Sequence, residues 1–189
     1  SGSGGSSPAR SSSSCIAVFG FFGPSRFFFR FRATDQHPFG LSPPSLRAVT
    51  NLQGFGPRSI FIDCDVIQAD GGTRTASITG GFVALVEAFD TLRRRGVCTK
   101  LPIRDMVAAT SVGLVQNQVL LDLSFEEDSR AEVDMNVVMT GAGQLVEIQG
   151  TGERGTFTEA QMAQLFQSAK AGIERLVALQ REALKDVLP

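Results

Sequence analysis

The sequence predicts an α+β fold in which helices lie on a mixed β-sheet. Two observations lead to this prediction. From residue 59 onward, apolar runs with the period of strands and long stretches with the period of helices follow one another in the order β-α-β-β-β-β-α. The chain has 189 residues, of which 42% are hydrophobic and 20% charged, so it is long enough for one hydrophobic core and short for two.

The first strand is predicted at residues 59–68, SIFIDCDVIQ, where apolar residues recur at every second position. These residues are Ile60, Ile62, Cys64 and Val66. Asp63 and Asp65 alternate with them, so we expect both carboxylates to face solvent. A helix is predicted to follow at residues 75–96, where Ile78, Phe82, Leu85, Phe89 and Leu92 recur at helical spacing. Its basic last turn and closing glycine are typical of a helix C-terminus.

Two hairpins and a second helix complete the predicted order. The hairpin strands are expected at residues 106–115, 119–125, 134–140 and 144–150. The first turn is expected at Gln116 and Asn117, and the second at residues 141–143, Gly-Ala-Gly. A long helix is predicted to begin near Thr158, because Thr158 and Gln161 have the spacing of a capping box.

Residues 1–45 differ in composition from residues 46–189, which we predict to form the domain. They are rich in Ser and Gly, and residues 19–31 hold seven Phe without a clear strand or helix period. We therefore expect residues 1 to about 40 to be disordered. Two interpretations stay open. The Arg and Ser content is typical of an organelle transit peptide, whereas the missing initiator Met and the Phe run favour a misread gene model.

The charges are distributed unevenly along the chain. Residues 1–58 hold six Arg and one acid, whereas residues 59–189 hold twelve basic and eighteen acidic residues. The net charge of −1 therefore neither predicts nor excludes RNA binding. Basic residues that could contact an RNA backbone are Arg47, Arg58, Arg93 to Arg95, Lys100 and Arg104. No aromatic residues interleave with them, as a single-strand binder usually shows.

Cysteine and histidine content narrows the possible chemistry. Cys15, Cys64 and Cys98 show no disulfide or CxxC pattern, which indicates reduced thiols and a cytoplasmic protein, or an organellar one if residues 1–45 are a transit peptide. His37 is the single histidine, so most His-dependent triads and zinc sites are excluded. No apolar stretch of about 18 residues lacks a charge or a helix breaker, and we expect no membrane span.

A glycine turn, DGGTR at residues 70–74, connects the first strand to the first helix. Free N–H groups at a helix N-terminus and the helix dipole favour an anion there. Glycines let the backbone approach the anion, Thr73 adds a hydroxyl, and Arg74 can bind two oxygens at once. The alternative is a plain strand-to-helix turn with a solvated Arg74.

An acidic stretch, residues 126–134, lies between two predicted strands. Carboxylates near a bound phosphate can protonate a leaving oxygen or hold a divalent cation. The alternative is a solvated acidic loop.

Several long segments resemble the ribonuclease PH family. Residues 62–80, IDCDVIQADGGTRTASITG, are similar to the family's signature almost word for word. The other similar segments are SLRAV at 45–49, MVAATSVGLV at 106–115, EDSRAEVDMNVVMT at 127–140 and LVEIQGTGE at 145–153. The final helix fits as well, so the resemblance covers about three quarters of the chain.

The resemblance implies the fold that this family shares with polynucleotide phosphorylase and exosome ring subunits. It also implies a phosphate-dependent 3′ exoribonuclease, whose reverse reaction adds nucleotides. Gly72, Thr73 and Arg74 would bind inorganic phosphate, the co-substrate. Asp128 and Asp134 would be the catalytic acids, one as general acid and the other as ligand of Mg²⁺.

The expected partners also follow from the resemblance. They are tRNA precursors and other RNA 3′ ends, with Arg47 as an RNA-binding residue, and further copies of the chain in a hexameric ring of dimers. The sequence departs from the family at its front. The family's first strands have no counterpart there, and HPFGLSPP at residues 37–44 stands in place of a second phosphate-binding arginine. This departure implies impaired activity, and the alternative function is a non-catalytic RNA-binding ring subunit.

Overall fold

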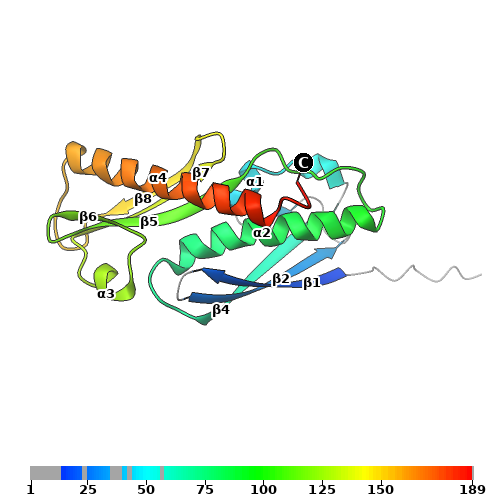
Figure 1. The fold of residues 1–189 in the computed structure, drawn as a ribbon, viewed down its shortest axis with the longest axis horizontal. Helices are drawn as coiled ribbons and strands as arrows, with labels where there is room; N and C mark the ends of the chain where they lie inside the picture. Colours follow the sequence, from blue (N-terminus) through cyan, green and yellow to red (C-terminus); the bar gives the residue numbers. More distant parts are fainter. Residues whose placement is uncertain (1–13, 23–24, 35–39, 42–43, 56–57, 189) are drawn as a thin grey trace, which may run out of the picture.

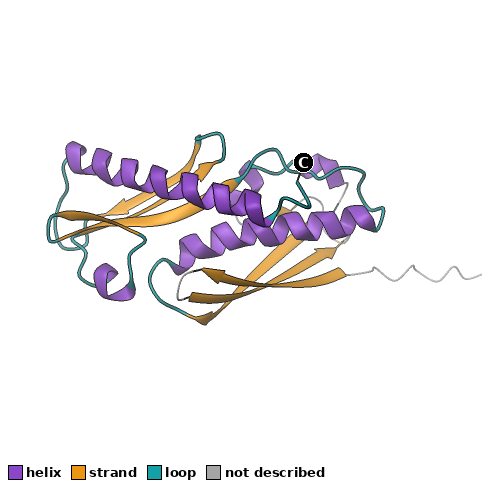
Figure 2. Cartoon of the chain, viewed as in Figure 1, coloured by secondary structure: helices purple, strands orange, loops and turns teal. Residues whose placement is uncertain are grey.

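A computed structural model describes residues 14–22, 25–34, 40–41, 44–55 and 58–188. These residues form two four-stranded β-sheets with helices lying along them (Figures 1 and 2). The predicted α+β class is confirmed, with two sheets in place of the single mixed sheet that the sequence predicted.

The first sheet joins the Ser/Phe-rich segment to the predicted strand at residues 59–68. Its strands are β1 (Ser14–Phe22), β2 (Ser25–Thr34), β3 (Gly40–Leu41) and β4 (Ser59–Gln68), in the order β1-β2-β4-β3. β2 pairs antiparallel with both β1 and β4, and β3 pairs parallel with β4. Asp63 and Asp65 are exposed on β4, as predicted.

The expectations of disorder and of missing front strands are wrong for residues 14–22 and 25–34. β2 pairs with β4 from Arg26 to Thr34, with one irregularity after Arg26, and Phe29 lies opposite Cys64 in the register. The sequence in fact has the period of two that is typical of a strand. Phe27, Phe29 and Phe31 alternate with Arg30 and Arg32, and the additional Phe28 makes this alternation hard to recognise. Aromatic residues favour strands, and without β2 one edge of β4 would be unpaired. Residues 1–13 lie outside the described residues.

Helix α2 (Thr73–Arg94) lies along the first sheet and reaches the second (Figure 1). Its predicted apolar stripe is buried, and Phe82, Leu85 and Phe89 have no exposed surface. Each such side chain contributes about 1.5–3 kcal/mol through its removal from water. The stripe belongs to one core that also includes residues of the second sheet and of the C-terminal helix.

The second sheet is antiparallel and contains both predicted hairpins. Its strands are β5 (Val107–Val115), β6 (Gln118–Leu121), β7 (Val133–Thr140) and β8 (Leu145–Thr151), in the order β6-β5-β7-β8. Gln116 and Asn117 have φ angles of 50° and 64°, so the first turn is the tight two-residue turn that was predicted. The second turn spans residues 141–144, with a positive φ at Gly143.

Helix α4 (Glu159–Ala183) covers one face of the second sheet (Figure 2). Its predicted capping box is present: Thr158 accepts from the backbone N–H of Gln161, and Gln161 accepts from that of Thr158. Near its end, the buried Gln180 amide donates to the carbonyl oxygens of Thr79 and Val107, at 2.9 Å each. α4 is therefore fixed to both α2 and β5.

The segment between the hairpins differs from the prediction. The strand expected at residues 119–125 ends at Leu121, and Phe125–Asp128 form the short helix α3. Ser124 and Glu127 form a capping box at its start, which stabilises a helical turn over a strand. Part of the acidic stretch expected to be a loop is therefore helical. The remaining short helices are α1 (Pro44–Ala48) and the 3₁₀ helix η1 (Leu52–Phe55).

No helix in the described part of the chain combines the length and the apolar content needed to cross a membrane.

Candidate functional site

The glycine turn at residues 70–74 lies against the segment that leads into α3. A Cβ atom on Gly71 would lie 1.9 Å from the carbonyl oxygen of Leu123, so no side chain fits at this position. Gly72 is the N-cap of α2 and has φ 68° and ψ 21°, in the left-handed region that disfavours other residues. The two glycines are thus required for different reasons, and together they bring the start of α2 close to the residues after β6.

The N-terminus of α2 has the properties of an anion site. The helix has 22 residues, no acidic residue in its first turn, and no side chain that caps it. The hydroxyls of Thr75 and Ser77 donate to carbonyl oxygens of their own helix, so they do not occupy the N-terminal N–H groups. These N–H groups and the helix dipole favour a negative charge in front of Thr73.

Arg74 lies beside this N-terminus and contacts β8. Its Nη2 atom is 2.5 Å from Oε1 of Glu147, and the two side chains are 48% and 34% exposed. An ion pair with this exposure contributes about 0–1 kcal/mol, so an anion can replace Glu147 at modest cost. The sequence analysis missed Glu147, although its polar position within the apolar run LVEI marks it as a residue on the outer face of a strand.

The strand register brings the acidic residues to the same face of the second sheet as Arg74. Asp134 lies opposite Gly113, and Glu147 lies opposite Val138, which is four residues from Asp134 on β7. Residues an even number of positions apart on a strand share a face. Because Arg74 contacts Glu147, the structure places Arg74 and Asp134 on one side of the sheet.

Asp134 lies near two further carboxylates. Burial raises the pKa of the Asp134 carboxyl above its usual range, and the negative charges of Asp128 and Glu153 raise it further, while the Met135 N–H partly opposes them. The environment therefore favours the protonated form of Asp134 at a given pH. In the described part of the chain, no three such side chains converge closely enough to hold a metal ion. Asp128 and Asp134 could supply only part of a Mg²⁺ coordination sphere, which is usual for this ion.

A second acidic group includes Asp122, whose Oδ1 lies 3.5 Å from the position of a Cβ on Gly72. Burial raises the pKa of Asp122, and so do the charges of Asp70 and Glu127. Asp70 accepts from the backbone N–H of Phe125 at 2.8 Å, which connects the glycine turn to α3. Asp122 was missed by the sequence analysis, because it lies within the run predicted as strand 119–125.

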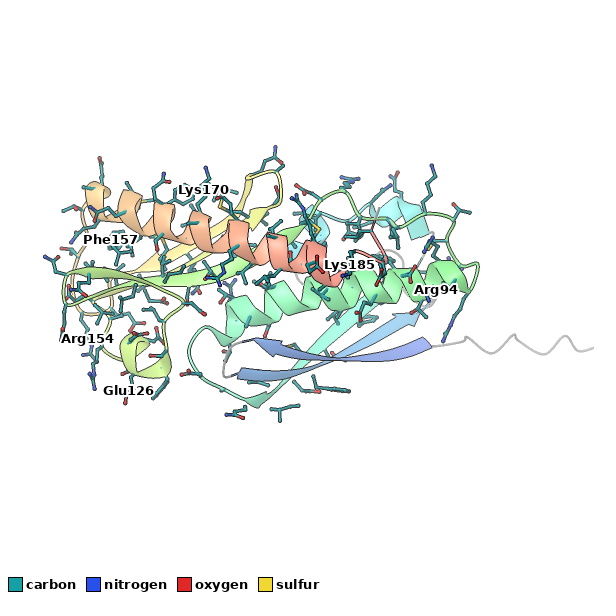
Figure 3. All side chains as sticks on the ribbon, viewed as in Figure 1. Arg94, Glu126, Arg154, Phe157, Lys170 and Lys185 are labelled. Carbon is teal, nitrogen blue, oxygen red and sulfur yellow. The ribbon has the colours of Figure 1, made fainter. Side chains whose placement is uncertain are left out.

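Beside the glycine turn the surface forms a hollow of about 510 Å³, lined by Ala69, Asp70, Ser124, Phe125 and Glu126. Phe125 is 67% exposed there. Arg154 lies at the same end of the molecule as Glu126 (Figure 3), and its guanidinium donates to the Ser129 carbonyl at 2.6 Å. An aromatic ring and a cation thus lie near the acidic segment, where the sequence analysis expected neither.

Arg47 is not brought to this region. It is exposed on α1, and Figure 1 shows α1 well apart from α3. The described structure therefore places Arg74 and Asp134 on one side of the second sheet, with Asp128 near Asp134, and leaves Arg47 outside this region.

Comparison with known proteins gives consistent matches. The model of the 3′ exoribonuclease family, domain 2, matches residues 105–172, which include Asp128 and Asp134. Ribonuclease PH of Bacillus cereus (strain B4264) and that of Bacillus anthracis (strain A0248) are both 57% identical to this chain over 145 residues. The matched part is 76% of this chain and 59% of each relative, so the chain spans less than two thirds of the relatives' length.

Solved structures show the same fold at low identity. A chain of the Archaeoglobus fulgidus exosome with RNA bound to the active site matches with a TM-score of 0.69 and 15% identity, over 87% of this chain and 86% of that one. Rice (Oryza sativa) Rrp46 matches with a TM-score of 0.67 and 14% identity, over 92% of this chain and 94% of that one. Both matches extend over more of the chain than the sequence match does.

Proposed function

This chain belongs to the ribonuclease PH family, and from that premise we propose that it removes nucleotides from RNA 3′ ends by phosphorolysis. An oxygen of inorganic phosphate forms a bond to the phosphorus of the last phosphodiester, while the bond from that phosphorus to the 3′ oxygen of the preceding nucleotide breaks. The freed 3′ oxygen takes up a proton, and the last nucleotide leaves as a nucleoside diphosphate. The reverse reaction adds a nucleotide.

One observation supports this proposal above the others: the N-terminus of α2, Arg74 and Asp134 lie on one side of the second sheet. We assign Gly72, Thr73 and Arg74 to the attacking phosphate, with the backbone N–H groups and the guanidinium as donors. Phosphoryl transfer depends mainly on positioning and charge neutralisation, so such a site can act without histidine.

Asp128 and Asp134 take the remaining roles in this proposal. One protonates the leaving 3′ oxygen, and the other would hold Mg²⁺, which would neutralise charge on the phosphate oxygens. The carboxylate oxygens are the hard donors that Mg²⁺ prefers, and water and phosphate would complete its coordination. The environment of Asp134, with the Asp128 and Glu153 charges beside it, supports both roles.

The RNA itself is proposed to approach along the exposed surface at this end of the molecule. Arg154 offers a cation for its backbone and Phe125 a ring on which a base can stack. We further propose that the substrates are tRNA precursors and other RNA 3′ ends, and that the chain assembles into a hexameric ring of dimers in which Arg47 contacts RNA. The proposed compartment is the cytoplasm, where thiols such as Cys64 and Cys98 stay reduced.

The test is release of nucleoside diphosphates from a transfer RNA with extra 3′ nucleotides, with and without phosphate. We expect phosphate-dependent release that Arg74→Gln and Asp134→Asn each lower by about 10²–10³-fold. Arg175→Gln and Asp63→Asn are matched controls, because both residues are exposed and lie outside the site, and they should leave the rate unchanged. Release that does not depend on phosphate would contradict the proposal.

A second candidate function is RNA binding without catalysis, as a subunit of a ring. HPFGLSPP at residues 37–44 favours it, because the family's second phosphate-binding arginine is absent there. Under this alternative the chain binds single-stranded RNA, releases no nucleoside diphosphate, and shows the same RNA affinity after Asp134→Asn. An enzyme that lacks one of two phosphate-binding arginines would still release nucleoside diphosphate, but about 10²–10³-fold more slowly. To distinguish it from a non-catalytic subunit, the assay must therefore detect release at that lower rate.

A further inference from the structure

Ser111 on β5 carries a buried hydroxyl that has no hydrogen-bond partner among the described residues. The residue is only 4% exposed. A buried hydroxyl without a partner is unfavourable and uncommon in folded proteins, so it points to a group that binds there.

The hydroxyl is directed at the start of α2. Its Oγ atom is the nearest atom to the position that a Cβ on Gly72 would take, at 3.3 Å. In the register Ser111 lies opposite Asn136, two residues along β7 from Asp134, and therefore on the same face as Asp134. Ser111 thus lies beneath the N-terminus of α2 and beside the acidic residues.

The chemistry of the surroundings favours an anion as the missing partner. The Ser111 hydroxyl is a hydrogen-bond donor, and the nearby backbone N–H groups of the first turn of α2 are donors as well. Oδ1 of Asp122 lies 3.5 Å from the same Cβ position, yet it makes no hydrogen bond to Ser111. Several donors around a space beside a helix N-terminus are complementary to an anion with more than one oxygen.

We infer that the Ser111 hydroxyl donates a hydrogen bond to an oxygen of inorganic phosphate bound at the N-terminus of α2. This inference rests on the proposed function, because that function supplies phosphate as the anion. Ser111 would be the deepest ligand of the phosphate, approaching it from the sheet, whereas Arg74 approaches from the side of β8.

Titration of the full chain with inorganic phosphate in a calorimeter tests the inference directly. A hydrogen bond to a charged group corresponds to about 10- to 100-fold in affinity, so Ser111→Ala should weaken phosphate binding by that factor. Ser45→Ala is the matched control: Ser45 is also a buried hydroxyl without a partner in the described structure, but it lies on α1. It should leave phosphate affinity unchanged.

Thermal unfolding without phosphate separates a ligand from a structural residue. Because the hydroxyl is unpaired in the absence of phosphate, Ser111→Ala should then unfold at the same or a higher temperature than the unaltered chain. Equal phosphate affinity in Ser111→Ala and the unaltered chain overturns the inference, and so does an unaltered chain that binds no phosphate.

The same titration distinguishes this inference from the proposed function. If phosphate binds and Ser111→Ala weakens it while no nucleoside diphosphate is released, the inference stands and the proposed function fails. If nucleoside diphosphate is released and Ser111→Ala leaves both the phosphate affinity and the KM for phosphate unchanged, the proposed function stands and the inference fails.

Discussion

Alanine substitutions at three glycines test the geometry of the anion site, because the structure gives each glycine a different reason to be there. Gly96 follows α2 with φ 74°, and nothing lies within 4 Å of a Cβ placed on it. Gly72 has a similar φ of 68°, but a Cβ there would lie 3.3 Å from Ser111 and 3.4 Å from Thr75. A Cβ on Gly71 would lie 1.9 Å from a backbone oxygen.

These distances give an order of unfolding free energies. Gly96→Ala incurs only the left-handed backbone penalty, about 1–2 kcal/mol, partly offset by the lower entropy of the unfolded chain. Gly72→Ala adds slight crowding to the same penalty, for a total of about 1–3 kcal/mol. Gly71→Ala must move the backbone at Leu123 by more than an ångström, so we expect a loss of about 3 kcal/mol or more.

Urea unfolding followed by far-ultraviolet circular dichroism measures these changes, and the absence of Trp and Tyr makes intrinsic fluorescence unsuitable. Phosphate titration of the folded variants provides a second measurement. Gly72→Ala should weaken phosphate binding, whereas Gly96→Ala should not, since Gly96 lies at the other end of α2. A Gly71→Ala variant as stable as Gly96→Ala would refute the close approach of the glycine turn to Leu123.

Three further predictions concern charged and aromatic groups around the site. Glu147→Gln removes a negative charge and frees Arg74, so phosphate should bind up to about 5-fold tighter in the same titration, and the unfolding free energy should change by less than about 1 kcal/mol. Weaker phosphate binding would mean that Glu147 instead holds Arg74 in its binding position. Asp134→Asn should lower activity by about 10²–10³-fold, yet raise the unfolding free energy at pH 7 in metal-free buffer. Burial and neighbouring charges raise the pKa of Asp134, so the unfolded chain ionises more readily than the folded one. This gain in unfolding free energy should develop as the pH rises from about 3.9, the usual pKa of Asp, through the raised pKa of Asp134, and it should be absent at lower pH. A gain that persists in acid would contradict the prediction. Phe125→Ala should leave thermal stability unchanged, since the ring is 67% exposed, and weaken binding of single-stranded RNA by about 1–3 kcal/mol. Unchanged RNA affinity would exclude base stacking on Phe125.

Local patterns were sufficient to predict most elements of the second half of the fold. The period of two predicted β4, the helical stripe predicted α2, and the capping box at Thr158 predicted the start of α4. The prediction was wrong at residues 119–125, because the capping box at Ser124 lies inside an apolar run. It was also wrong at β2, where one additional Phe conceals the alternation.

The spatial arrangement of the site residues could not be predicted from local sequence patterns. Ser111 and Glu147 join the site through the register of β5, β7 and β8, which is fixed by pairing between distant segments. Shifting β8 by one residue would move Glu147 to the face that α4 covers and remove the partner of Arg74. The glycine turn was visible in the sequence, whereas the side chains that surround it were not.

We propose that the charges around α2 make a phosphate site there depend on an added cation. Asp70 and Glu127 lie near Asp122, whose carboxylate is close to Gly72, and Asp128 and Glu153 lie near Asp134. Asp134 is on the same face of the second sheet as the partner of Arg74, Glu147. The positive charges near these carboxylates include the Arg74 guanidinium, which is paired with Glu147, the Arg154 guanidinium beside Ser129, and the partial charge of the helix N-terminus. A phosphate dianion added to these carboxylates would increase the repulsion, which a divalent cation held by Asp128 or Asp134 would offset. Burial is the main cause of the raised pKa values of Asp122 and Asp134, and repulsion from the neighbouring carboxylates raises both further. In this proposal, the acids assigned to the reaction are also the groups that would make the site depend on a cation.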